Sequence, residues 1–181
     1  SGNEVHSPEQ DLQNKLGQRV GEAETQLKRP LSQHEKEDIE RQTTYDYAKE
    51  HGTWIDNLYS LGDPTGVSGN ENTLALDKKN SVVYKANNLS NYQNSISKFL
   101  AGIRAHNKLF PETKYELVGF TGLEKGAGGI PYVEPVIKQD YIPDASQATQ
   151  GEIDNHMRSL GFEKVNDHTF RNNNYTVSDL R

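Results

Sequence analysis

The chain has 181 residues, which suits one ordinary domain with an appendage or two small lobes. Its formal net charge of -6 argues against nucleic acid or an acidic membrane as the main partner. The absence of cysteine excludes disulfides and thiolate metal sites. No apolar run is long enough to span a bilayer and no signal peptide is visible, so cytoplasmic residence is the default expectation.

Residues 1–56 are strongly polar and carry the signals of two helices. Ser7, Pro8 and Gln10 predict an N-cap, a first helical proline and a polar N3 residue, and Ser32 with Glu35 forms a second capping box. A narrow apolar stripe follows the first cap at helical spacing, and it consists of Leu12, Leu16, Val20, Ala23 and Leu27. We expect residues 1–56 to be a helical arm or linker that needs a partner surface.

Residues 59–85 read as strand, glycine-bearing loop, strand, turn and strand. The glycines are Gly62, Gly66 and Gly69, and Lys85 stands near the end of the third strand. Glycine lets a backbone approach a polyanion closely, and a lysine on a neighbouring strand adds a point charge to the same phosphates. Protein kinases hold ATP in this way, although their loop has the spacing GxGxxG and this one has GxxxGxxG.

The remainder of the chain alternates short strands and helices. An amphipathic helix is expected to end near residue 107, and residues 115–120 and 132–137 read as two strands joined by a glycine-rich hairpin. Pro135 inside the second strand indicates an edge position or a bulge. After a polar stretch, a capping box at Thr149 predicts a short helix stopped by Gly161, and a hairpin with its turn at residues 172–174 follows.

This order of elements resembles the small lobe of a protein kinase followed by the start of its large lobe. The segments VVYKANN, AHNKLFPETKYELVGFTG, VEPVIKQDYI, GFEKVNDHTF and YTVSDLR resemble the kinase-like domain of polyvalent proteins, which are large proteins of bacterial phages and conjugative elements. The resemblance covers roughly residues 58–181. It implies an α+β fold with an antiparallel five-stranded sheet and one helix in a small lobe at 57–142, and a large lobe that begins at 143–181.

The resemblance also implies roles for particular residues. Lys85 matches the lysine that contacts the α- and β-phosphates of ATP, and the three glycines match the flexible phosphate loop. Gln139 and Tyr141 fall in the interlobe hinge, whose backbone groups face an adenine. Asp179 falls at the catalytic aspartate that accepts the proton of the substrate hydroxyl, although Ser178 stands where a histidine usually precedes it.

Two departures from the kinase pattern affect the expected activity. Residues 90–110 contain no Asp or Glu, so the lysine lacks its usual helical partner, and Glu112, Glu116 and Glu134 are substitutes only by proximity. The asparagine and aspartate that bind magnesium after the catalytic aspartate are not among residues 1–181. Since phosphoryl transfer depends on positioning and metal, we expect weak ATP binding without turnover from these residues alone, with magnesium bound only in a complete domain.

Other interpretations of the same residues remain open. The glycine segment could be a simple hairpin with a surface lysine, and Asp179 could be solvated near a chain end. Six histidines show no metal-binding spacing, and no metal site is expected. A different class of function is a non-catalytic, pseudokinase-like interaction module that binds a protein partner or self-associates through uncovered apolar surface.

Overall fold

The structure is a computed structural model, and it describes residues 7–65, 69–141, 150–166, 169–172 and 176–178. The chain forms two compact units, Ser1–Tyr141 and Ile142–Arg181. Within the described residues, the first unit holds three α-helices and a six-stranded sheet, and the second holds one α-helix and a three-stranded sheet. This is the mixed α+β class expected from the sequence.

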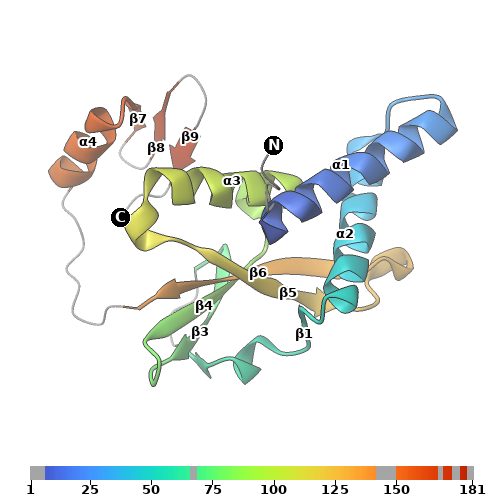
Figure 1. Cartoon of the computed structure of the whole chain (residues 1–181), viewed down its shortest axis with the longest axis horizontal. Coiled ribbons are helices and arrows are strands. Elements are labelled where there is room, and N and C mark those ends of the chain that lie inside the picture. The colour runs from blue at the N-terminus through green and yellow to red at the C-terminus, as the bar shows by residue number, and fades with distance from the viewer. Residues whose placement is uncertain (1–6, 66–68, 142–149, 167–168, 173–175, 179–181) are drawn as a thin grey trace, which may run out of the picture. The chain divides into compact units, whose positions relative to one another are not determined.

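The first unit begins with the two expected helices, α1 (Pro8–Leu27) and α2 (Gln33–Glu50) (Figure 1). The Ser7 hydroxyl accepts a hydrogen bond from the backbone N–H of Gln10, as the capping pattern predicts. Both halves of the second capping box are also present, because Glu35 N–H donates to the Ser32 hydroxyl and the Glu35 carboxylate accepts from Ser32 N–H.

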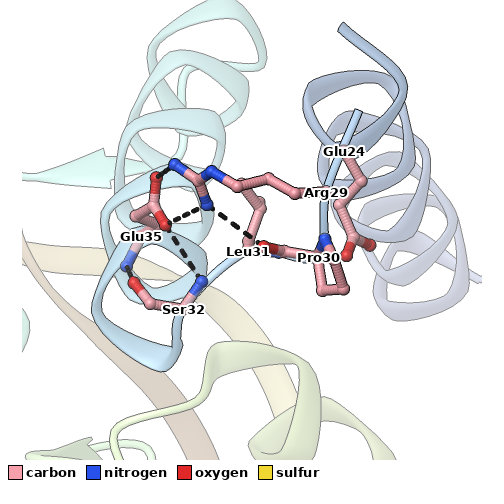
Figure 2. Close-up of polar contacts among 6 residues, drawn as sticks. All are labelled: Glu24, Arg29, Pro30, Leu31, Ser32 and Glu35. Carbon is pink, nitrogen blue, oxygen red and sulfur yellow. Dashed lines mark hydrogen bonds and ion pairs between the residues drawn. The ribbon is translucent and has the colours of Figure 1, made fainter. Parts of the chain in front are cut away.

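A compact polar corner turns the chain from α1 into α2, as Figure 2 shows. The Arg29 guanidinium donates two hydrogen bonds, of 2.9 and 3.0 Å, to the two carboxylate oxygens of Glu35. The Glu24 carboxylate accepts the backbone N–H of Leu31 at 3.0 Å. The corner therefore satisfies the backbone donors of Leu31, Ser32 and Glu35 with side chains from α1, from the N-cap and from the first turn of α2.

The sheet of the first unit has the strand order β1-β5-β6-β4-β3-β2. Its strands are β1 (Trp54–Ile55), β2 (Asp63–Pro64), β3 (Asn72–Asp77), β4 (Val82–Asn87), β5 (Glu116–Leu123) and β6 (Tyr132–Asp140). Strands β2 to β6 pair antiparallel, whereas β1 pairs parallel with β5. The sequence predicted five antiparallel strands, and this number is wrong because β1 adds a sixth, parallel strand at the edge.

Residues 59–61 are not a strand, contrary to the sequence prediction. Leu58–Ser60 forms a 3₁₀ turn, capped by the Asn57 side chain, which accepts the backbone N–H of Tyr59 at 3.0 Å. The edge strand β2 begins only at Asp63. A local side-chain cap therefore overrides the strand preference of this short apolar run.

Helices cover one face of the sheet. Helix α3 (Ile96–Leu109) follows β4 and buries Ile96, Phe99, Leu100 and Ile103. The same buried cluster contains Leu12 and Leu16 of α1, Ala48 of α2, and Phe120, Val133 and Ile137 of the sheet. The arm is thus part of the main hydrophobic core of this unit rather than a separate extension.

The other face of the sheet carries a smaller cluster. Ala75, Ala86 and Val136 are buried there beneath Leu58, which the 3₁₀ turn presents.

Pro135 lies on β6, which is an internal strand, so an edge position is excluded. Pro135 pairs with Phe120 of β5 next to a register shift, and the pairing of β6 with β4 ends one residue later in the chain, at Val136. The missing proline N–H therefore removes no bond to β4.

The second unit contains α4 (Gln150–Ser159), β7 (Glu163–Asn166), β8 (Thr169–Arg171) and β9 (Thr176–Ser178). Gly161 has a φ of 82° and ends α4, with Phe162 N–H donating to Met157 O at 3.0 Å and Gly161 N–H donating to Arg158 O at 2.9 Å. This confirms the predicted Schellman end. Strands β8 and β9 form the expected hairpin, and β7 adds a third strand.

Candidate functional site

Lys85 lies on β4, which is flanked on both sides by paired strands. It stands opposite Leu74 of β3 and Ile137 of β6, so the three side chains share the face that α3 covers. Its ammonium group donates a 3.3 Å hydrogen bond to the Gln139 side-chain oxygen and lies 5.6 Å from the centre of the Tyr115 ring. The side chain is half-buried, so its charge is held at a partly desolvated point of the sheet.

Tyr115 is held by the last turn of α3. The Asn107 side chain donates to the Tyr115 carbonyl and accepts the Tyr115 N–H, both at 2.8 Å. The His106 ring stacks on the Tyr115 ring with centres 4.1 Å apart, and it contacts the Thr113 carbonyl at 2.8 Å through Nε2. Burial lowers the pKa of His106, and the charge of Lys85 adds to this effect.

Of the predicted loop glycines, Gly62 comes just before β2 and Gly69 comes before β3, the strand that pairs with the Lys85 strand. A Cβ atom on Gly62 would lie 2.7 Å from the backbone carbon of Leu76, so glycine is required there by close strand packing. A Cβ atom on Gly69 would meet nothing within 4 Å. Gly66 lies outside the described residues, so of the three glycines only Gly62 and Gly69 are placed.

The predicted hinge residues lie at the end of β6 and just after it. The Gln139 side chain contacts Lys85, and the Tyr141 N–H donates to the Ser81 carbonyl at 2.8 Å. An open cavity of about 540 Å³ adjoins this point, in the size range of small-molecule sites. Its lining comes from the ends of β4 and β6, the loop before β5 and the start of α1, and includes Val82, Tyr115, Gln139 and Asp140.

The structure also places a carboxylate that the sequence reasoning missed. Glu71, just before β3, accepts hydrogen bonds from Asn87 at 3.1 Å and from Asn91 at 2.7 Å. It also helps raise the pKa of Tyr115, behind the larger effect of burial. The signal that could have found it is the unusual density of asparagines at positions 70, 72, 87, 88 and 91.

The three acidic residues considered as substitutes are engaged elsewhere or face the cavity. Glu116 pairs with Lys138 at 3.1 Å, and Glu134 accepts a 2.7 Å hydrogen bond from the Tyr132 hydroxyl. Glu112 is exposed at the cavity edge.

Asp179 lies outside the described residues, so the structure does not place it. Within the described ranges, no group of three or more histidine and acidic side chains is arranged to hold a metal ion. In the same ranges, none of the helices combines the length and apolar character required to cross a bilayer.

A comparison with protein families identifies the chain. The model for the serine/threonine/tyrosine kinase found in polyvalent proteins matches residues 36–181. The chain belongs to this kinase family. The match begins within α2, earlier than the resemblance at residues 58–181 indicated. No curated protein and no solved structure gives a significant match. Kinase family membership agrees with the α+β fold and with Lys85 on a central strand beside the glycine-bearing hairpin.

Proposed function

We propose that this kinase domain binds ATP, and that Lys85 contacts the phosphates. The observation that carries the proposal is the position of Lys85 within a kinase-family segment: half-buried, on the strand after the glycine-bearing hairpin, and on the helix-covered face. A lysine ammonium is a compact point charge suited to phosphate oxygens. The ancestral chemistry is transfer of the ATP γ-phosphate to a hydroxyl group, with Asp179 as the base.

The sheet around Lys85 offers an apolar surface of the kind that a nucleotide base requires. Leu74 and Lys85 are register partners, as are Leu76 and Val83, so all four side chains share one face. Leu74, Leu76 and Val83 are half-buried, which leaves part of this surface accessible. Apolar walls with a few polar groups are typical of cofactor sites. The base would lie toward Gln139, and the phosphates toward Lys85 and the β2–β3 loop.

The proposal does not include a magnesium ion held by the described residues, because their carboxylates do not form a suitable cluster. Magnesium would neutralise charge on the phosphates during transfer. We therefore propose that residues 1–181 alone bind ATP without turnover. Incubation with ATP, magnesium and hydroxyl acceptors is expected to give no ADP above background. ADP release that is lost in Lys85→Ala would contradict this part of the proposal.

ATP titration of the full 181-residue chain tests the binding. We expect a rise in melting temperature with ATP in the wild type and at least a tenfold weaker Kd in Lys85→Ala, since a charge-assisted phosphate contact is removed. The matched control is Lys49→Ala. Lys49 is an exposed lysine on α2 that pairs with Glu124 at 2.8 Å and does not line the cavity. Equal loss in both variants would contradict the assigned role.

The interaction module is the competing outcome of the same titration. If ATP at millimolar concentration neither raises the melting temperature nor gives heat of binding, the nucleotide proposal fails. The kinase scaffold would then serve as a surface for a protein partner or for a second copy of the chain. Size-exclusion chromatography with light scattering on the same sample distinguishes self-association from a monomer that needs another partner.

A further inference from the structure

We infer that Tyr115 and Gln139 position the Lys85 ammonium group, so that helix α3 acts on this lysine through an aromatic ring. The inference rests on the proposed function, which it deepens by naming the groups that set the lysine for phosphate. Neither residue belongs to the glycine loop or to the acidic residues that a kinase pattern suggests. Both contacts come from the same side of β4, from β6 and from the residue just before β5.

The geometry around the ammonium group supports two different kinds of contact. The Nζ atom lies 5.6 Å from the centre of the Tyr115 ring, within the range of cation–π attraction. The Gln139 side-chain oxygen accepts a hydrogen bond from Nζ at 3.3 Å. One partner precedes β5 and the other is on β6, next to the strand that carries Lys85. Together they restrict a side chain that would otherwise have many rotamers.

The ring itself is fixed by α3. His106 stacks on it at 4.1 Å, and the two hydrogen bonds of Asn107 hold the Tyr115 backbone at 2.8 Å. The helix is fixed in turn at its other end, because Glu40 of α2 accepts the Ser97 N–H at 2.8 Å. The position of the last helical turn is therefore transmitted to Lys85 through Tyr115.

This arrangement differs physically from the lysine–glutamate pair of kinases, where a helix carboxylate holds the lysine. Helix α3, Ile96–Leu109, contains no carboxylate. An aromatic ring and a neutral amide attract the ammonium group without cancelling its charge. The contacts of Tyr115 and Gln139 therefore orient the Lys85 ammonium group without adding an opposite charge of their own.

The test uses the full chain with its lysines reductively methylated with ¹³C, because each dimethyl-lysine then gives its own NMR signal. The Lys85 signal is assigned by its loss in Lys85→Arg. We expect the face of the Tyr115 ring to shift this signal upfield, and the shift to be lost in Tyr115→Leu but kept in Tyr115→Phe. Gln139→Ala should leave the ring and reduce the shift, because the side chain becomes more mobile.

A control variant removes an aromatic ring next to Lys85 in the sequence. Tyr84 is half-buried and projects from the opposite face of β4, so Tyr84→Leu should leave the Lys85 signal unchanged. An unchanged Lys85 signal in both Tyr115→Leu and Gln139→Ala would overturn the inference. If Tyr115→Leu fails to fold, Gln139→Ala alone decides, since Gln139 is only partly buried.

ATP affinity is measured on the same variants without methylation. We expect the Kd to rise roughly fivefold in Tyr115→Leu, the scale of one cation–π contact, and to stay unchanged in Tyr84→Leu. ATP affinity and the Lys85 methyl signal test the proposed function and the positioning inference independently. If the wild type does not bind ATP, the proposed function is wrong, while the methyl signals still decide whether Tyr115 and Gln139 position Lys85. If ATP binds equally well to wild type and Tyr115→Leu, the positioning inference is wrong.

Discussion

The carboxylate of Glu40 in α2 accepts the backbone N–H of Ser97 in the first turn of α3, at 2.8 Å. It also accepts the Ser95 hydroxyl at 3.2 Å, and Ser95 is the N-cap of α3. The side chain is buried, so a carboxyl group from one helix lies against the positive end of another. This contact joins the N-terminal arm to the helix that supports the candidate site.

Replacing Glu40 by Gln should change how stability depends on pH. Burial raises the pKa of Glu40 above its usual 4.5, although the hydrogen bonds from Ser97 and Ser95 oppose this. Because the pKa of Glu40 is higher in the folded state, the protonated Glu40 side chain stabilises the fold relative to the ionised one. This contribution of Glu40 is complete below pH 4.5 and is lost as pH rises through the folded pKa. We therefore expect the difference in unfolding free energy, wild type minus Glu40→Gln, to decrease with rising pH.

Urea unfolding at a series of pH values between about 4 and 8 measures this difference. The control is Gln26→Ala, at an exposed position on α1, and because neither side chain titrates, its difference from the wild type should be nearly constant with pH. If the two variants give parallel curves, the buried Glu40 carboxylate does not carry the expected linkage.

His106 should titrate below its usual range and respond to Lys85. Burial is the main cause of its lowered pKa, and the Lys85 ammonium group adds repulsion. Because the pKa of His106 is lower in the folded state, the neutral imidazole stabilises the fold. This contribution of His106 is present above pH 6.5 and is lost as pH falls through the folded pKa. In an NMR titration of the ring protons, Lys85→Met should raise the His106 pKa. Lys108→Met, an exposed change on the same helix, should have a smaller effect.

Two glycine-to-alanine substitutions should have opposite effects on stability. A Cβ on Gly21 in α1 meets nothing within 4 Å, so Gly21→Ala should stabilise the chain by about 0.5–1 kcal/mol through helix propensity. A Cβ on Gly119 in β5 would lie 2.2 Å from the Thr53 carbonyl oxygen, so Gly119→Ala should destabilise it by about 1–3 kcal/mol. Thermal unfolding of both variants checks the signs, and a stabilised Gly119→Ala would contradict the close approach.

Loss of a buried leucine from α1 should destabilise the whole first unit. Leu12 is completely buried in the cluster that contains the α3 and sheet residues. Leu12→Ala should therefore lower the unfolding free energy by about 2–5 kcal/mol. Leu27, on the same helix and 49% exposed, gives the control Leu27→Ala with an expected change within about 0.5 kcal/mol. Similar small effects in both variants would mean that α1 is not part of the cooperative core.

The sequence predicted the features that depend on local chemistry. The caps at Ser7 and Ser32 and the Schellman end at Gly161 are each specified by a few adjacent residues, and all three are confirmed. The α3 helix and the strands around Lys85 follow from apolar periodicity in the same way. The strand predicted at residues 59–61 was wrong, because the Asn57 side chain caps a 3₁₀ turn formed by residues with strand propensity.

The contacts of the candidate site could not be predicted, because they join residues far apart in sequence. Tyr115 and Lys85 are brought together by the pairing of β4, β6 and β5, and no local pattern marks an aromatic ring as a cation partner. Glu71 was missed for a similar reason, since its partners Asn87 and Asn91 lie across the β3–β4 hairpin. The parallel pairing of β1 with β5 also depends on tertiary packing alone.

The burial of Leu12 and Leu16 affects where this kinase domain can be cut for expression. A clone that starts at residue 36 would keep the entire segment that matches the family. It would nevertheless remove both leucines, together with Gln13, whose amide bonds Ser97 and Arg104. The exposed flank of α3 would then face water, and the shortened polypeptide would tend to aggregate. Family boundaries drawn from sequence similarity therefore fall inside the cooperative folding unit of this chain.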